Sequence, residues 1–195
     1  YEMQIKFEFE HDPTVVEVLK REAIKISDIQ RVKQHDIYFK PKQGGEHEYL
    51  RLREEQVAPE SEKGEPIGKP QYTLTSTAGT VIDEGDIAIM RRKKMDAKVE
   101  PTIAFFMNYF GVEIEKEIEK IRRRVKCVYN GVNISINIDN FIKPAISMHY
   151  VEVKSSAWTE KEASRYRDIM KEFIGVLGFE GAKQIEQAYY EMIKA

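Results

Sequence analysis

The chain has 195 residues, of which 33% are charged and 42% are hydrophobic, and its formal net charge at pH 7 is −2. This length and apolar content predict a folded chain with a sizeable core and exclude a disordered tail. No apolar run approaches the roughly 20 residues of a bilayer-spanning helix, so we expect no membrane association. The balanced charge argues against specific nucleic-acid binding, because such proteins usually carry a basic excess.

Cys127 is the single cysteine of the sequence, which excludes an internal disulfide. The N-terminal residues contain no apolar leader, and both features favour a cytoplasmic protein. The strand alternation places Cys127 on an apolar face with Val125 and Tyr129, so we interpret it as a core residue rather than a nucleophile.

The first half of the chain shows mainly strand patterns. Residues 1–10 alternate apolar and polar side chains, as in a strand with one polar face. Apolar residues at helical spacing after Pro13 predict a helix over 13–25. Further strands are predicted over 35–40, 49–53, 72–77 and 87–92. Residues 54–71 contain three prolines and few apolar side chains, so we expect a mobile loop there.

The second half begins with a helical segment that Pro101 opens and Gly111 ends. Residues 112–117 form a charged connection that fits either a helix or a loop. Strands are predicted over 118–129, 132–139 and 148–154. Asn130-Gly131, between the first two of these strands, is a strong signal for a tight hairpin turn.

Two helices are predicted near the C-terminus. Thr159 and Glu162 have the spacing of a capping box, which marks the start of the first helix. The second helix is predicted over 182–194 from the spacing of its apolar residues. The whole pattern predicts one α+β domain over residues 1–195, with seven or eight mostly antiparallel strands and helices on the outside.

Several of these strands have a polar face rich in arginine and lysine. One strand carries Arg51 and Arg53, and another carries Lys120, Arg122 and Arg124. A solvated outer face is the simplest interpretation of any one such strand. However, like charges two residues apart repel each other, and arginine is suited to bidentate phosphate contacts. If these faces turn inward, they form a cationic channel that a polyanion neutralises, with carboxylates holding a bridging divalent cation.

At this point the sequence resembles a known family. Glu2-x-Gln4-x-Lys6 resembles the E-x-E-x-K signature of the CYTH family, also called triphosphate tunnel metalloenzymes. This family includes class IV adenylyl cyclases, thiamine triphosphatases and inorganic triphosphatases. Further pieces resemble the family's motifs in the same order: Asp36-Ile37-Tyr38-Phe39, Leu50-Arg51-Leu52-Arg53, Ile118-x-Lys120-x-Arg122, Ile138-Asp139, Val151-Glu152-Val153 and residues 188–192. The resemblance implies an α+β fold with a closed, eight-stranded antiparallel β-barrel that forms a triphosphate tunnel.

The resemblance also implies a site. The catalytic residues it implies are Lys6, Glu2 and Glu152. The substrate-binding residues are Lys6, Arg51, Arg53, Lys120 and Arg122, with Arg124 added from the strand alternation and Arg91 as a looser candidate. The ligands of a bound Mg²⁺ or Mn²⁺ would be Glu2, Gln4, Asp139 and Glu152.

Some residues depart from the family pattern. Gln4 replaces the second glutamate of the first motif, and Lys154 replaces the last glutamate of the family's E-x-E motif. Residues 90–94 stand where the family has R-x-E-x-E and contain no glutamate. The chain therefore lacks several of the family's carboxylates but keeps its cations, which weakens the case for efficient hydrolysis and strengthens the case for anion binding.

Three functions follow from this resemblance. The leading hypothesis is metal-dependent hydrolysis of inorganic triphosphate, thiamine triphosphate or a nucleoside triphosphate. The alternatives are an adenylyl cyclase that makes cyclic AMP from ATP, and a degenerate module that binds a polyphosphate or nucleotide without turnover. Each implies a small-molecule partner, and a homodimer is compatible with all three. A structural domain with a charged outer surface remains the non-functional alternative.

Overall fold

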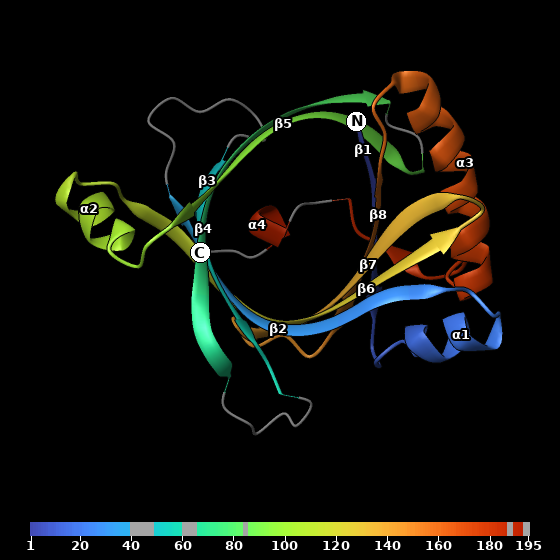
Figure 1. Ribbon diagram of the computed structural model, residues 1–195, viewed down its shortest axis with the longest axis horizontal. Coiled ribbons are helices and arrows are strands. Elements are labelled where there is room, and N and C mark those ends of the chain that lie inside the picture. Colours follow the sequence, from blue (N-terminus) through green and yellow to red (C-terminus); the bar gives the residue numbers. More distant parts are fainter. Residues whose placement is uncertain (40–48, 60–65, 84–85, 187–188, 193–195) are drawn as a thin grey trace.

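The computed structural model describes residues 1–39, 49–59, 66–83, 86–186 and 189–192. Strands and helices follow one another along the chain as Figure 1 shows. The strands are β1 (Glu2–Phe9), β2 (Ile26–Phe39), β3 (Tyr49–Val57), β4 (Ile67–Asp83), β5 (Ala88–Val99), β6 (Ile114–Tyr129), β7 (Val132–Lys143), β8 (His149–Ser156) and β9 (Lys183–Gln184). The helices are α1 (Val15–Arg21), α2 (Ile103–Tyr109), α3 (Glu160–Leu177) and α4 (Tyr189–Met192).

Strands β1 to β8 form an antiparallel ring. The order around it is β5-β4-β3-β2-β6-β7-β8-β1, and β1 closes the ring by pairing with β5. The closing register pairs Glu2 with Met90 and Gln4 with Ala88. Strand β9 pairs with the other end of β1, next to Phe7 and Glu8. The predicted closed antiparallel arrangement of eight strands is therefore confirmed (Figure 1).

The main hydrophobic core lies on the outer face of the ring. Because side chains alternate along a strand, Met3, Ile5 and Phe7 of β1 share one face, and they pack with buried residues of α1 and α3. Leu19 of α1 and Phe173 of α3 are completely buried in this cluster. The outward faces are thus apolar and covered by helices, which leaves the polar faces to line the inside.

Two sequence predictions about single positions hold in this core. Cys127 is buried in the main cluster, and burial raises the pKa of its thiol to about 11. Thr159 caps α3: its hydroxyl accepts from the Glu162 backbone N–H, and the Glu162 carboxylate accepts from the Thr159 backbone N–H, 3.2 Å in each direction. Both features belong to the outer layer of the ring, away from its interior.

The strands are longer than predicted. Residues 54–57 continue β3 and 67–71 belong to β4, where Glu54 pairs with Tyr72 and Glu55 with Gln71. The loop predicted over 54–71 is therefore shorter, and its residues 60–65 lie outside the described part of the chain. Residues 114–117, predicted as helix or loop, begin β6. Charged residues extend these strands because backbone pairing does not depend on side-chain polarity.

The last predicted helix is wrong at its start and in its place. Residues 183–184 form β9 instead, and the helix that the structure describes in this range is α4, over Tyr189–Met192. Helix α4 lies within the ring rather than outside it (Figure 1). There Tyr189 packs against Phe141 and Tyr150, with ring centroids 5.1 and 5.8 Å apart. Residues 187–188 and 193–194 of the predicted helix lie outside the described residues. No helix that the structure describes is long and apolar enough to cross a membrane.

Candidate functional site

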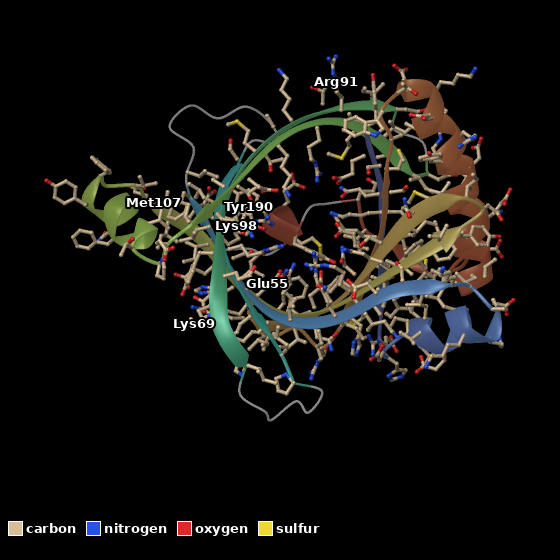
Figure 2. All side chains as sticks on the ribbon, viewed as in Figure 1. Glu55, Lys69, Arg91, Lys98, Met107 and Tyr190 are labelled. Carbon is tan, nitrogen blue, oxygen red and sulfur yellow. The ribbon has the colours of Figure 1, made fainter. Side chains whose placement is uncertain are left out.

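The inside of the ring holds a cavity of about 920 Å³ with a strongly charged lining. Among the described residues, five strands contribute eight cationic side chains to it, which are Lys6, Arg51, Arg53, Arg92, Lys94, Lys120, Arg122 and Lys154. Six carboxylates also line it, namely Glu2, Asp86, Glu115, Glu152, Glu186 and Glu191. Lys6 and Lys120 are buried there, at 5% and 2% exposure. The ring therefore gathers cations from strands distant in sequence around one internal space (Figure 2).

The sequence predicts Arg91 on the face that lines the cavity, but the structure places this side chain elsewhere. It is exposed on the outside of the ring, as its label in Figure 2 shows, while Arg92 lines the cavity. The pairing of β5 with β4 and β1 sets which residues point inward, and it puts Met90, Arg92 and Lys94 on the inner face. Two adjacent arginines cannot both face inward on a strand, and the sequence does not give the register.

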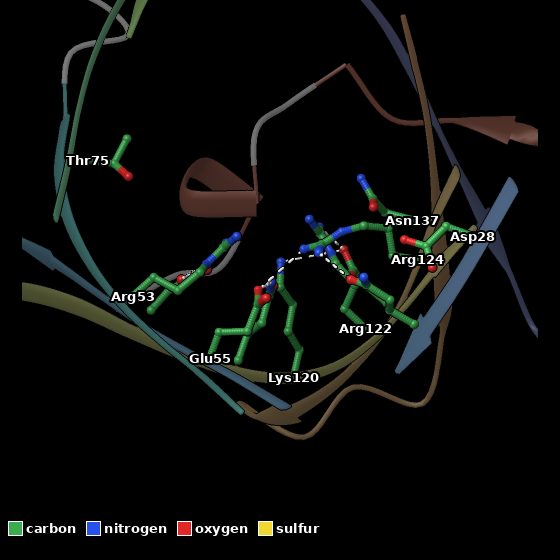
Figure 3. Close-up of polar contacts among 12 residues, drawn as sticks. Asp28, Arg53, Glu55, Thr75, Lys120, Arg122, Arg124 and Asn137 are labelled. Atoms are coloured by element: carbon green, nitrogen blue, oxygen red, sulfur yellow. Dashed lines mark hydrogen bonds and ion pairs between the residues drawn. The ribbon is translucent and has the colours of Figure 1, made fainter. Parts of the chain in front are cut away.

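Asp139 is completely buried and binds two of the predicted phosphate-binding cations. Arg122 donates to it through Nε at 2.7 Å and Nη2 at 2.6 Å, and Lys120 Nζ lies 3.5 Å from Oδ2 (Figure 3). Burial alone would raise the pKa of Asp139, but the charges of Arg122 and Lys120 lower it below its usual range. Asp139 is therefore an ionised anchor that holds both cations at the cavity wall.

Asp36 of β2 also anchors cavity arginines, in this case those of β3. It was not identified from the sequence as a site residue. Arg53 donates to it through Nε at 2.6 Å and Nη2 at 2.7 Å, and Arg51 Nε lies 3.8 Å away. Burial opposes ionisation of Asp36, but both arginines keep its pKa well below the usual range. The alternation along β2, where Gln34 and Asp36 are buried polar residues, is the sequence signal that could have identified it.

Lys120 has a lowered pKa. Burial lowers its pKa to about 7, with the nearby charge of Arg122 acting in the same direction and Asp139 opposing it. Its Nζ lies 4.6 Å from the ring centroid of Tyr189 on α4, and Lys6 Nζ lies 5.4 Å from the same centroid. Tyr189 thus covers two lysines of the cavity.

Arg124 was predicted to bind substrate but does not line the cavity. Its guanidinium donates to Gln30 Oε1 at 3.2 Å and to Glu55 Oε2 at 3.3 Å. Both partners belong to strands β2 and β3, and all three side chains lie beyond the cavity lining. The alternation put Arg124 on the correct face but did not show where the cavity ends along β6.

The four predicted metal ligands do not form a metal site. Arg92 Nη1 lies 2.7 Å from Glu2 Oε1, Lys154 Nζ lies 3.1 Å from Glu152 Oε2, and Asp139 is bound as described above. The amide of Gln4 donates to Met90 Sδ at 3.6 Å. Within the described residues, no group of three or more histidine, cysteine, aspartate or glutamate side chains could hold a metal ion. A cation lies within ion-pair distance of one oxygen of Glu2, one oxygen of Glu152 and both oxygens of Asp139, so the residues present do not fit a divalent ion.

Comparison with solved structures shows the same fold at low sequence identity. A protein of Pyrococcus horikoshii aligns at 18% identity and a TM-score of 0.68, covering 98% of this chain and 97% of its own. A candidate adenylate cyclase of Vibrio parahaemolyticus aligns at 14% identity and 0.66, with the same coverage. A Hippeastrum protein, described as a candidate adenylyl cyclase with a dominant triphosphatase activity, aligns at 11% and 0.59, covering 98% of this chain and 94% of its own.

No curated protein matches the chain significantly, whereas a protein-family profile does. The profile of the CYTH domain matches residues 1–189, which is nearly the whole chain and includes every strand of the ring. The chain therefore belongs to the CYTH domain family.

Proposed function

We propose that the chain binds a small molecule bearing a triphosphate group inside the ring and hydrolyses it. Members of the CYTH family are triphosphatases or cyclases that act on such substrates. The observation that supports the proposal most strongly is the convergence of eight cations from five strands on one internal cavity. Inorganic triphosphate, thiamine triphosphate and nucleoside triphosphates all carry the group that these cations suit.

The arrangement of the cations fits a linear polyanion. Arg53 and Arg122 are each held rigidly by a bidentate carboxylate on the wall, which keeps their remaining N–H groups oriented at little entropic cost. Charge-assisted hydrogen bonds to phosphate oxygens are about twice as strong as neutral ones. Fixed cations of this kind neutralise the charge that develops as water attacks a terminal phosphorus in line.

CYTH enzymes generally use Mg²⁺ or Mn²⁺, but the predicted ligands of this chain are already paired with cations. We therefore assign Glu2 and Glu152 the role of positioning Arg92 and Lys154 in the cavity. Lys6, the third predicted catalytic residue, lies in the same region, opposite Glu152 in the β1–β8 register. It would contact the substrate directly.

A second candidate is binding without turnover. The ion pairs of Glu2, Glu152 and Asp139 favour it, because a cation already lies against each of the carboxylates predicted to hold a metal. A chain of this kind would act as a sensor of a polyphosphate or nucleotide.

A product assay separates these functions. The purified chain is incubated with inorganic triphosphate, thiamine triphosphate and ATP, and free phosphate and cyclic AMP are both measured. We expect phosphate release that falls at least about tenfold in Arg122→Ala, from the loss of charge-assisted contacts. Cyclic AMP as the main product would identify a cyclase instead, and ligand binding with neither product would establish the sensor.

A further inference from the structure

We propose that the triphosphate site of this chain works without a divalent cation, because the ammonium group of Lys154 stands between the two carboxylates that would otherwise hold the metal. The inference rests on the proposed triphosphate binding and concerns how the site is neutralised. Its support is the geometry where β1, β8 and β5 meet at the closing seam of the ring.

The position of Lys154 is the first observation. Its Nζ lies 3.1 Å from Glu152 Oε2 and 3.8 Å from Glu2 Oε1. The ammonium group is therefore within ion-pair distance of a carboxylate on each of two neighbouring strands. Its side chain is 26% exposed, and Lys154 lines the cavity. A divalent ion that bridged these carboxylates would need the space that the ammonium group takes.

Arg92 supplies a second charge at the same place. Its Nη1 lies 2.7 Å from Glu2 Oε1, the oxygen that Lys154 also approaches. The side chains of Arg92 and Glu2 are 17% and 24% exposed. Lys154 and Arg92 together carry two positive charges, which is the charge of one Mg²⁺ or Mn²⁺ ion. The seam therefore has a built-in substitute for a divalent ion, in the form of two cationic side chains.

The strand register explains why no ligand set remains. Gln4 on β1 lies directly opposite Lys154 on β8, and Lys6 lies opposite Glu152. At these two neighbouring inward positions, one pair is an amide with a lysine and the other is a lysine with a glutamate, so neither pair brings two carboxylates together. A hard divalent ion needs about six oxygen ligands. Here it would have to displace Lys154 and Arg92 and would then be repelled by them.

Asp139 does not complete a set either. Both of its oxygens accept from Arg122, and Lys120 lies beside one of them. Removing a cation from this buried carboxylate is strongly unfavourable, because it leaves a charge unpaired in the interior. The wall and the seam are therefore both neutralised by residues of the chain.

The test measures binding rather than turnover. Tripolyphosphate is titrated calorimetrically into the wild-type chain in EDTA, and separately into chelator-free buffer with Mn²⁺. We expect clear binding in EDTA that Mn²⁺ does not strengthen. A second arm titrates Mn²⁺ alone and follows the free ion by electron paramagnetic resonance. We expect no stoichiometric Mn²⁺ site in the wild type.

Two variants sharpen the result. Lys154→Glu removes the ammonium group and places a third carboxylate beside Glu2 and Glu152, so it should weaken binding in EDTA at least about tenfold and gain a Mn²⁺ site that restores it. Lys126→Glu is the matched control, because it reverses the same charge on an exposed lysine that does not line the cavity. It should bind like the wild type under both conditions.

The two proposals fail in different ways. If the wild type binds tripolyphosphate only with Mn²⁺, or takes up Mn²⁺ alone at one equivalent, the metal-free site is wrong while the proposed function stands. If tripolyphosphate does not bind under either condition, the proposed function itself fails. The wild-type arms decide both questions even where Lys154→Glu does not fold, which circular dichroism would show.

Discussion

At the scale of single residues, the cavity is built from cations that buried carboxylates hold in place. Asp36 and Asp139 are both fully buried, and each fixes one arginine by two hydrogen bonds. Lys120 shares Asp139 with Arg122 but lies farther from it. Of these cations, Lys120 is the one whose pKa falls close to neutral pH, so its charge responds to solution conditions.

This charge predicts a pH dependence of binding. Tripolyphosphate prefers the protonated Lys120, so the affinity of the wild type should fall as pH rises through about 7. In Lys120→Met this step should disappear, while changes that arise from the ionisation of the ligand remain in both proteins. Calorimetric titrations between pH 6 and about 9 would measure it. Parallel pH curves for the two proteins would contradict the assignment to Lys120.

The lowered pKa of Lys120 also affects stability, which should change with pH in the direction opposite to that of the binding affinity. Because the pKa of Lys120 lies below its unfolded value of 10.5, the unfolded chain binds more protons between about 7 and 10.5. The contribution of Lys120 to the free energy of unfolding therefore increases as pH rises through this window. Binding and stability should thus respond in opposite directions when Lys120 loses its proton.

At the scale of the elements, the outer layer and the interior have separate roles. Helix α3 covers the apolar face of the ring with Met170 and Phe173, which are completely buried. Its first turn depends on the capping box of Thr159 and Glu162, and Gly178 ends it in the left-handed conformation with a φ of 75°. The elements that stabilise the fold therefore lie on the side of the sheet away from the cavity.

Removal of the cap should affect stability alone. Thr159→Ala leaves a backbone N–H of α3 without its partner, so the free energy of unfolding should fall by about 1 kcal/mol. Urea denaturation measures it, and Ser164→Ala in the same helix is the control, expected to change stability by less than about 0.5 kcal/mol. Tripolyphosphate affinity should be unchanged in both variants. Loss of affinity in Thr159→Ala would contradict the separation of layer and cavity.

At the scale of the whole molecule, the net charge of −2 conceals an uneven distribution. The inside of the ring collects eight cations, and its buried carboxylates serve to hold them. A nearly neutral chain can therefore present a cationic interior, so the overall charge balance does not exclude a polyanionic ligand.

The sequence predicted the strands and their polar faces, because alternation is a local property. It could not give the β1–β5 seam, which pairs Glu2 with Met90 although the two residues lie far apart in the sequence. For the same reason it placed Arg91 inside instead of Arg92, and it left Asp36 without a role. It also could not show that Glu2 and Glu152 pair with cations, because that depends on the register between β1 and β8.

The most direct test of the central claim compares two adjacent arginines of β5. Arg92 lines the cavity and Arg91 is exposed outside the ring, so each serves as the control for the other. Tripolyphosphate is titrated calorimetrically into the wild type, Arg92→Ala and Arg91→Ala in the same buffer. The account predicts that Arg92→Ala binds at least about tenfold more weakly and that Arg91→Ala binds like the wild type. Equal affinities in the two variants, or a loss confined to Arg91→Ala, would contradict it.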